Sequence, residues 1–580
     1  MHIVKFAAPY FLILAAAANA QNPPPIELWY WHHSYLTSPA AVQSSEALID
    51  QALAAGYTGV AFWDSSFSFM SAPFWPPQNV AYLQEVMNYA SAKGLKIAGT
   101  VAPYGYSNDA LQNNPNWAEA QRVVGSEFKV NSAGNSLQFL NSFPGLANPG
   151  FESGRTAWFG LGDSGIGVDH TVSHSGTSSG IIQNAGGNAR FWQPMTLIPW
   201  RQYHLRLFFK TQSFRGFTQA DVIDAVDGNA VRFNAIFNVS STQNWTQVDY
   251  TFNSQSSSAA YLYFGVWGGC TGTMWFDDIL LEETSLVFVA RRVGTPVTVY
   301  DPQNPTTIYR EGTDYNHVSD PAMASRTPFT NLYHQPPTVS LPSGTQLKPG
   351  QVVAMDLYSV SPMPAAGVQV GMCLTAPGTL KWLARNAAAV NAALPAGAGY
   401  FMQYDEMRQM NSCATCKAKK MTPGQLLAWH VGQAIQTYDT LRPGAPLYIW
   451  SDMFDPYHNA HADYYDVEGD IAGSWLGLPA SLTVMNWNLQ NLAVSLKWFS
   501  GLNPSQPVAH PQFIAGYYDS GNGAASATTE LAQAAGVPGV RGLMYTTWID
   551  DYSQLQSFAI AAKAAWPAYL ASVGLAPVRP

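Results

Sequence analysis

A short apolar run that ends in aromatic or polar residues recurs along this chain, and this repeat limits the fold more than any other feature. Three such runs, at residues 26–31, 58–63 and 95–101, are separated by segments of helical period at about 39–55 and 79–93. Short links between strand, helix and strand favour a parallel α/β sheet. Continuous apolar strands are typical of a parallel sheet that is buried on both faces.

Five further runs of this kind lie in the last third of the chain, at residues 400–404, 447–450, 482–485, 512–516 and 542–545. Three strands before the intervening segment and five after it give eight, the number of strands in a TIM barrel. The sequence therefore predicts an α/β fold, a (β/α)8 TIM barrel. Its mouth is expected to be formed by the residues that follow each strand, where such barrels carry their active sites.

The segment between the third and fourth predicted strands has no helical period. Short alternating runs such as 203–210 and 259–264 are separated by Gly, Ser, Asn and Thr, which is the pattern of a β-sandwich. The barrel is thus predicted to be interrupted after strand three by a β-sandwich and a small β-rich module. The predicted units are 21–142 (first part of the barrel), 143–283 (β-sandwich), 284–362 (small β-rich module) and 363–580 (second part of the barrel, with the catalytic residues).

Three short motifs of the predicted sandwich resemble those of sandwich-type carbohydrate-binding modules. They are Asn-Pro-Gly-Phe-Glu at 148–152, His-Ser-Gly-Thr-Ser at 174–178 and Trp-Phe-Asp-Asp-Ile at 275–279. Such openings and closings recur in sandwich modules of many functions. Sugar binding by this insert and a purely structural role both stay open.

The first twenty residues have the pattern of a signal peptide. Lys5 supplies a positive charge, residues 6–17 are apolar, and Ala18-Asn19-Ala20 is a small-x-small cleavage site. We expect cleavage near Ala20 and a secreted or periplasmic protein. No later stretch approaches about 20 uninterrupted apolar residues, so no membrane span is expected.

The composition indicates what kind of ligand suits this chain. Charged residues make up 11% of it, aromatic residues 13%, and the net charge is -9. A nucleic-acid partner is excluded because no basic stripe is present to neutralise phosphates. Few charges and many aromatic rings suit a neutral ligand with flat C–H faces, so we expect an oligo- or polysaccharide.

The chain has four cysteines, Cys270, Cys373, Cys413 and Cys416. Export permits disulfides, and a local bond between Cys413 and Cys416 is predicted to stiffen the loop after residue 406. Zinc would need two more ligands, and there is no second Cys-x-x-Cys, so neither a metal nor another cofactor is expected. The pairing of Cys270 and Cys373 stays open.

Two adjacent carboxylic acids, Asp405 and Glu406, stand at the end of the run 400–404, with Arg408 and Asn411 close behind. A glycosidase needs an acid to protonate the leaving oxygen and a second group to stabilise or trap the oxocarbenium-like transition state. Repulsion from Asp405 is expected to raise the pKa of Glu406, so that Glu406 stays protonated near neutral pH. We therefore predict a glycoside hydrolase with Glu406 as acid/base and Asp405 as its catalytic partner.

The residues at the ends of the later strands resemble those of glycoside hydrolase family 20, the β-N-acetylhexosaminidases that act by substrate assistance. The matching positions are Asp405-Glu406, Trp450-Ser451-Asp452-Met453, Asn486-Trp487, Tyr517 and Trp548. The resemblance implies that Asp405 orients an acetamido group and that Tyr517 or Tyr518 hydrogen-bonds its oxygen. It also implies a sugar pocket walled by Trp450, Trp487 and Trp548. Met402-Gln403-Tyr404 stands where that family usually has His-x-Gly-Gly, and the long insert is foreign to the family.

Other aromatic and polar residues near strand ends complete the predicted site. The predicted substrate-binding residues are Trp31, His32, Trp63, Asp64, Tyr104, Arg408, Asn411, Trp450, Asp452, Asp455, His458, Asn486, Trp487, Tyr517, Trp548 and Asp550.

Two alternatives to substrate assistance stay open. A two-carboxylate glycosidase on a neutral glycan would use Glu406 with Asp452 or Asp550. A non-catalytic glycan-binding protein would use the sandwich and an inactive barrel. The sugar, its anomeric configuration, exo or endo action and the oligomeric state are not determined by the sequence.

Overall fold

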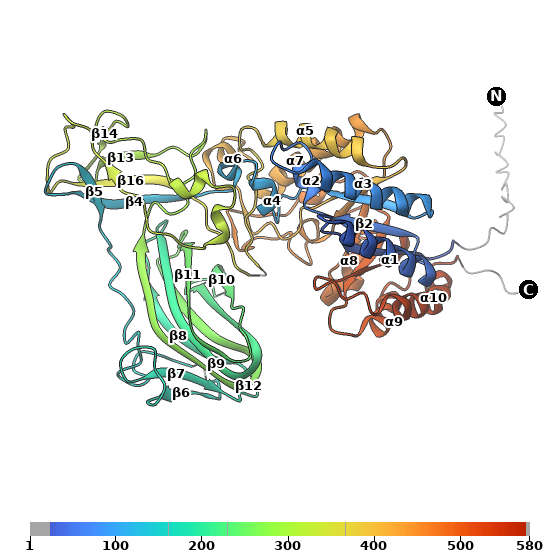
Figure 1. Ribbon diagram of the computed structural model, residues 1–580, viewed down its shortest axis with the longest axis horizontal. Helices are drawn as coiled ribbons and strands as arrows, with labels where there is room; N and C mark the ends of the chain where they lie inside the picture. The colour runs from blue at the N-terminus through green and yellow to red at the C-terminus, as the bar shows by residue number, and fades with distance from the viewer. Residues whose placement is uncertain (1–23, 161, 229, 366, 576–580) are drawn as a thin grey trace, which may run out of the picture.

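The computed structural model describes residues 24–160, 162–228, 230–365 and 367–575; the predicted signal peptide lies outside this part of the chain. Eight parallel strands form a closed barrel. In barrel order they are β1 (Glu27–His33), β2 (Gly59–Trp63), β3 (Lys96–Val101), β17 (Gly399–Met402), β19 (Leu447–Trp450), β21 (Thr483–Asn486), β22 (Gln512–Tyr517) and β23 (Val540–Thr546). Strand β2 and the surrounding helices lie at the right of Figure 1.

Helices pack on the outside of this barrel, and some of them begin or end at local sequence signals. Ser38 accepts a hydrogen bond from the Ala41 N–H at the start of α1, and Gly56 ends that helix in the left-handed conformation. Thr422 and Gln425 form a capping box at the start of α7. The longer helices are α1 (Pro39–Ala55), α3 (Pro77–Ala92), α5 (Thr379–Ala393), α7 (Pro423–Leu441), α8 (Leu492–Phe499), α9 (Gly523–Gln533) and α10 (Leu555–Ser572), and the short ones are α2 (Ser66–Phe69), α4 (Asn108–Leu111) and α6 (Ala414–Ala418).

The predicted (β/α)8 TIM barrel is wrong, because strand and helix do not alternate eight times. Between β19 and β21, all of whose connecting residues are described, there are two short 3-10 helices, η4 (Asp452–Phe454) and η5 (Ser474–Gly477), and the strand β20 (Asp466–Val467), but no α-helix. Pro456, Gly469 and Gly473 interrupt any helical period there. Antiparallel sheets make up much of the remaining chain, so the molecule is a parallel barrel joined to a large all-β region.

The largest antiparallel sheet has seven strands and arises from the segment after β5. Its strands β9 and β12 are very long, 23 and 26 residues, and pair with each other through register shifts at three places. They appear as the long curved ribbons of Figure 1 and enclose a separate apolar core. The strands are β6 (Ile166–Asp169), β7 (Ser179–Gln183), β8 (Ala189–Thr196), β9 (Gln202–Asp224), β10 (Val231–Ile236), β11 (Gln243–Asn253) and β12 (Ala259–Thr284).

The other large antiparallel sheet has six strands. Two of them precede the long-stranded sheet in the chain, and four follow it. Residues 21–142 were predicted as the first part of the barrel, but β4 and β5 within this range do not pair with barrel strands. Instead β4 pairs with β16, and β5 pairs with β15. In β4 buried and exposed residues roughly alternate, as in a strand with one solvated face. The strands are β4 (Gln121–Val130), β5 (Ser136–Phe139), β13 (Thr298–Asp301), β14 (Asn304–Tyr309), β15 (Val339–Ser340) and β16 (Val352–Ser359).

The inside of the barrel is filled mostly by aromatic side chains and supports the site above it. Trp29, Trp31, Phe401, Tyr448 and Trp450 belong to this interior cluster. Such filling makes the barrel a packed core rather than a pore, so ligands have access only to its ends. Among the described helices, none is long and apolar enough to cross a membrane.

Candidate active site

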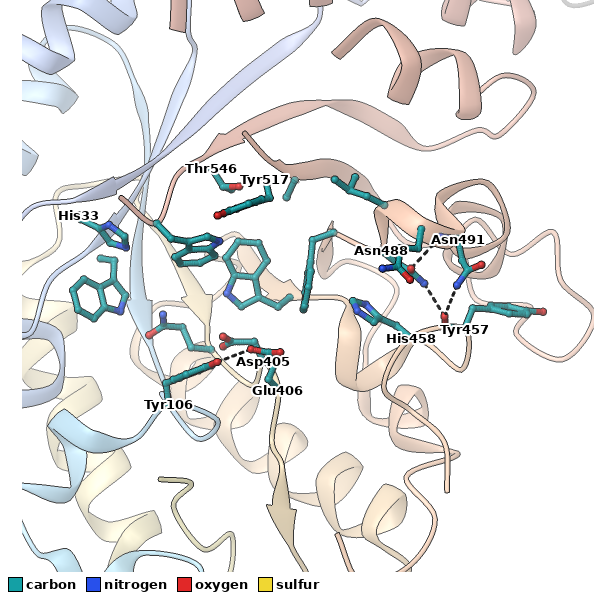
Figure 2. Close-up of a pocket in the computed structure, with 18 residues that line it drawn as sticks. His33, Tyr106, Asp405, Glu406, Tyr457, His458, Asn488, Asn491, Tyr517 and Thr546 are labelled. Atoms are coloured by element: carbon teal, nitrogen blue, oxygen red, sulfur yellow. Dashed lines mark hydrogen bonds between the residues drawn. The ribbon is translucent and has the colours of Figure 1, made fainter. Parts of the chain in front are cut away.

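A cavity of about 840 Å³ opens at the carboxyl ends of the barrel strands (Figure 2). Seven of the eight strands contribute a lining residue at their last position or directly after it, so the cavity is the barrel mouth. The lining residues are His33, Trp63, Tyr106, Gln403, Asp405, Glu406, Trp450, Tyr457, His458, Trp487, Asn488, Leu489, Gln490, Asn491, Ala515, Tyr517, Thr546 and Trp548.

The alternation of side chains along each strand decides which residues reach the cavity. In β1, Trp29 and Trp31 face the barrel interior, and Tyr30 packs in the outer core against the helices. His33, two residues after Trp31, therefore faces the cavity. The same two-residue step leads from Phe401 through Gln403 to Asp405.

Glu406 is held in a constrained position by its backbone and by three neighbours. Its φ is 45°, a left-handed conformation that is uncommon for residues other than glycine. Its backbone N–H donates to Asp452 Oδ2 at 2.7 Å. Its side chain accepts a hydrogen bond from the Tyr106 hydroxyl at 2.5 Å and forms an ion pair with Arg408 at 2.7 Å. The carboxylate of Glu406 is thus fixed at the cavity wall beside a positive charge.

Asp405 has the opposite environment. Its Oδ1 atom is buried and has no hydrogen-bond partner among the described residues. Burial is the largest cause that raises the pKa of Asp405 well above its usual value, followed by repulsion from Asp452 and from Glu406. The protonated form of Asp405 is therefore favoured, and a protonated carboxyl at a cavity wall has a proton to donate.

A third carboxyl group, that of Asp452, lies behind the pair and is fully buried. Besides the Glu406 N–H, it accepts hydrogen bonds from Asn459 Nδ2 at 2.9 Å and from Trp487 Nε1 at 3.2 Å. Burial raises the pKa of Asp452 to about 7, against the effect of these donors. Asp452 joins the Glu406 loop to the indole of Trp487 and places both at the cavity.

Arg408 is the centre of a polar network that fixes the Glu406 loop. Besides the ion pair, its guanidinium donates to the side-chain oxygen of Gln369 and to the Tyr106 hydroxyl. Gln369 in turn donates to the Glu406 carbonyl at 2.6 Å. Gln369 and Tyr106 are distant in sequence from residue 406, so the segment between β16 and α5 and the loop after β3 help to hold this carboxylate.

Tryptophan side chains form the walls of the cavity. Trp63, Trp450, Trp487 and Trp548 line it, and the buried Trp31 supports Trp450 and Trp548 from below, with ring centroids 5.3 and 5.8 Å away. Trp548 is 49% exposed, so its ring is available to a ligand. Indole faces and a few fixed polar groups are typical of a pocket for a small apolar-faced ligand.

The rim opposite the carboxyl pair carries further polar residues. His33 Nδ1 lies 2.8 Å from Asp550 Oδ1, so the predicted Asp550 contacts the lining residue His33 and does not itself line the cavity. Tyr517, rather than Tyr518, faces the cavity, and the Tyr518 hydroxyl donates to the buried Glu530 instead. The predicted His458 lines the cavity edge-on to the Trp487 ring.

Two predicted binding residues of the N-terminal strands lie away from this cavity. His32 points outwards from β1, where its Nε2 lies 3.0 Å from Ser45 Oγ and burial lowers its pKa to about 3. Asp64 accepts hydrogen bonds from the Ser34 hydroxyl and the Leu36 N–H, and so fixes the loop after β1. Asp64 borders a smaller neighbouring cavity of about 410 Å³.

The predicted residues Tyr104 and Asn411 are also buried outside the cavity. Tyr104 stacks on Tyr404 with ring centroids 5.4 Å apart. Asn411 donates through Nδ2 to the Glu468 carbonyl. Both residues support the backbone near residue 406, and neither lines the cavity.

Asp455 and Asn486 form a buried network instead of binding sites. Asp455 accepts hydrogen bonds from the Ser495 hydroxyl at 2.6 Å and from Asn488 Nδ2 at 3.0 Å. Asn486 Nδ2 donates to the same Ser495 oxygen. These contacts attach the loop after β19 to α8 and leave the polar atoms of both residues engaged.

The structure brings several residues to the cavity that the sequence did not single out as binding residues. Tyr457, Asn488 and Asn491 form one group, in which both amides donate to the Tyr457 carbonyl (Figure 2). Tyr457 lies in the link between β19 and β21, and Asn488 and Asn491 lie at the two ends of a three-residue 3-10 helix, Leu489–Asn491, which is too short to give a periodic signal. The other such residues are His33, Tyr106, Gln403, Leu489, Gln490, Ala515 and Thr546.

The predicted disulfide between Cys413 and Cys416 is not present. Their sulfur atoms are 3.6 Å apart, whereas a disulfide bond measures about 2.05 Å. Cys413 and Cys416 instead share their buried surroundings with Cys373, which comes from another part of the chain.

Comparison with known proteins adds little to this geometry. No family model matches the sequence, and no curated protein matches it significantly. Nothing found points to glycoside hydrolase family 20.

Carbohydrate-binding modules are among the solved structures similar to this chain. A family 16 carbohydrate-binding module is 20% identical and matches 23% of this chain and 97% of its own, with a TM-score of 0.20. The CBM22-1 xylan-binding domain from Paenibacillus barcinonensis is 15% identical and matches 25% and 97%, with a TM-score of 0.21. A cyclase from Fischerella sp. TAU is 13% identical and matches 25% and 97%, with a TM-score of 0.22. Similarity at this level assigns no ligand to this chain.

Proposed function

We propose that this protein is an exported glycoside hydrolase that binds an oligo- or polysaccharide at the barrel mouth and cleaves a glycosidic bond there. One observation carries the proposal: two adjacent carboxyl groups at a tryptophan-lined cavity have opposite environments. Asp405 has one buried and unpartnered carboxyl oxygen, and Glu406 is paired with Arg408. A protonated and an ionised carboxyl side by side are what glycosidic hydrolysis requires. Export rests on the sequence of residues 1–20.

The environments assign a role to each carboxyl group. Asp405 donates its proton to the leaving glycosidic oxygen as the bond from the anomeric carbon to that oxygen breaks. The ionised Glu406 stabilises the positive charge that develops on the sugar ring. Water adds to the anomeric carbon, and its released proton restores Asp405. This assignment exchanges the roles that the sequence predicts, in which Glu406 is the acid/base and Asp405 is its catalytic partner.

The choice of substrate separates the two designs of glycosidase. Tyr517 lines the cavity, and under substrate assistance it would hydrogen-bond the acetamido oxygen of an N-acetylhexosamine, with Asp405 orienting the acetamido nitrogen. For a neutral glycan Asp405 and Glu406 act without an acetamido group, because Asp452 is fully buried behind the pair and Asp550 is not among the residues that line the cavity. Inhibition by a thiazoline analogue of the cyclised acetamido group is expected only under substrate assistance.

One observation favours a second candidate function, a glycan-binding protein without catalysis. The Glu406 carboxylate already has Tyr106 and Arg408 as partners, as a purely structural carboxylate would. A panel of nitrophenyl glycosides, incubated with the mature protein, tests the proposal. Release of nitrophenol from at least one glycoside is expected, whereas oligosaccharide binding without release from any of them would favour the second candidate.

Replacing Trp548 by Ala tests whether the cavity is the sugar site. Loss of the indole face is expected to weaken oligosaccharide binding about tenfold, equivalent to about 1.4 kcal/mol, because the ring is half exposed at the rim. Calorimetric titration with the oligosaccharide measures the change. Phe217→Ala is the matched control, because Phe217 is 47% exposed but lies on β9, outside the cavity. Weakened binding in Phe217→Ala and unchanged binding in Trp548→Ala would place the sugar on the long-stranded sheet instead.

A further inference from the structure

A second polar cluster lies beneath the loop that follows Glu406, and the proposed function does not use it. Glu119, Cys373, Cys413 and Cys416 each offer one ligand atom, and these four atoms all lie within 4.8 Å of one another. All four residues are buried, with relative exposures of 0 or 1%. Three cysteines and a carboxylate at one buried point are a donor set that soft divalent cations prefer.

The sulfur atoms have the spacing of metal ligands rather than of a disulfide. Cys373 Sγ lies 3.5 Å from Cys413 Sγ and 3.5 Å from Cys416 Sγ, and the last two are 3.6 Å apart. Zn–S bonds of about 2.3 Å in a tetrahedron place sulfur atoms about 3.8 Å apart. A disulfide would bring two sulfurs to about 2.05 Å and leave the third without a partner. The nearly equilateral triangle therefore fits one ion bound by all three sulfurs.

Glu119 is oriented to supply the fourth ligand. Its Oε1 accepts hydrogen bonds from the backbone N–H groups of Ser412 at 2.7 Å and Cys413 at 3.2 Å. These bonds direct Oε2 towards the sulfurs, where it lies 3.9 Å from Cys416 Sγ. The carboxylate thus has one oxygen engaged by backbone and the other facing the three cysteines.

The surroundings of the cluster complete the charge balance and the outer contacts. The Thr375 hydroxyl lies 3.0 Å from Cys416 Sγ, and the Thr415 hydroxyl lies 3.1 Å from Cys413 Sγ. The buried Arg292 guanidinium interacts electrostatically with the cluster. Three thiolates and a carboxylate carry four negative charges, which a divalent ion and Arg292 reduce to one. Buried charges of one sign need such compensation.

We infer that Glu119, Cys373, Cys413 and Cys416 form a structural zinc site. Four buried protein ligands leave no open position, which distinguishes a structural site from a catalytic one. The ion would join three segments that are distant in sequence: the loop after β3, the segment before α5, and α6 with the loop that carries Arg408. The site would thereby fix the backbone next to Glu406. The inference rests on the cluster alone and is independent of the proposed function.

Elemental analysis of the purified full-length mature protein tests the site. We expect about one zinc per chain in the wild type and in Cys270→Ser, whose cysteine lies outside the cluster. We expect loss of zinc in Cys413→Ser and Cys416→Ser. Glu119→Gln keeps the shape of the ligand without its charge and is expected to bind zinc at least tenfold more weakly. Competition with a chromogenic chelator measures that affinity.

Two measurements on the wild type keep the inference falsifiable if the cysteine variants do not fold. Chelator treatment should lower Tm and should release thiols that react with a thiol reagent, and added Zn²⁺ should restore Tm. Co²⁺ in place of zinc should give the thiolate-to-metal charge-transfer absorption of a tetrahedral site. A protein without bound metal, in which peptide mapping finds two of Cys373, Cys413 and Cys416 joined by a disulfide, would overturn the inference. Unchanged zinc content in Cys413→Ser would overturn it as well.

Discussion

Asp405→Asn is expected to slow the hydrolysis of glycosides with poor leaving groups by about 10²–10⁴-fold, the range that general acid catalysis contributes. Dinitrophenyl glycosides should stay within about tenfold of the wild type, because a dinitrophenolate leaves without a proton. This split follows from the position of Asp405, whose buried and unpartnered oxygen favours the protonated form at the cavity wall. Values of kcat/KM for a phenyl and a dinitrophenyl glycoside of the same sugar measure it.

Glu406→Gln should behave differently, with a loss of about 10³-fold for both kinds of leaving group. Its carboxylate, paired with Arg408, is assigned to stabilise positive charge on the sugar, and that charge develops whatever group leaves. Asp463→Asn is the control, since Asp463 is an exposed carboxylate on a nearby loop. A leaving-group split in Glu406→Gln, with a uniform loss in Asp405→Asn, would contradict this assignment and support the roles implied by family 20.

Arg408→Met is expected to lower kcat/KM about 100-fold. The guanidinium holds Glu406, Gln369 and Tyr106 together, so its loss leaves the Glu406 carboxylate without its cation and frees the loop. Arg408→Lys should recover about tenfold of that loss, because an ammonium replaces the charge but not the planar fork. Steady-state kinetics of the three proteins measure these changes.

The partial recovery by lysine distinguishes positioning from simple loss of stability. Arg310→Met removes an exposed arginine that directly follows β14, and should leave kcat/KM unchanged. Thermal melting of each variant shows whether the fold is retained. Equal activity of Arg408→Met and the wild type, with an unchanged Tm, would show that Arg408 does not position Glu406 for catalysis.

The residues at the barrel mouth follow a rule that the sequence contains. Buried strands alternate between interior and exterior, so in β1 and β17 the position two residues beyond the last interior aromatic faces the cavity. In β1 this rule leads from Trp31 to His33 and excludes the predicted His32. In β17 it selects Gln403, which lies between Phe401 and Asp405.

The helices and the outer strands were less predictable. Apolar runs located the eight barrel strands because such strands are buried on both faces. The link between β19 and β21 could not be assigned a structure from periodicity, because buried carboxylates such as Asp455 order it through long-range hydrogen bonds. The pairing of β4 with β16 likewise joins segments more than 200 residues apart.

The cysteine cluster shows the same limit in another form. Cys413 and Cys416 are close in sequence, so a local bond between them was the natural prediction. Glu119 lies just before β4 and Cys373 lies before α5, so only the tertiary fold brings these two residues to Cys413 and Cys416. Because Glu119 and Cys373 are far from Cys413 and Cys416 in the sequence, no motif of fixed spacing could have identified them as ligands.

Hydrolysis in water enriched in oxygen-18 tests the central claim most directly. The mature wild-type protein is incubated with a glycan that contains the sugar identified by the glycoside panel. The masses of the products are measured by mass spectrometry. The account predicts new reducing ends that carry oxygen-18 at the anomeric carbon, and none from the Asp405→Asn/Glu406→Gln double variant. Three results would contradict it: products without the label, equal product formation by the double variant, or a wild-type protein that binds the glycan but releases no product.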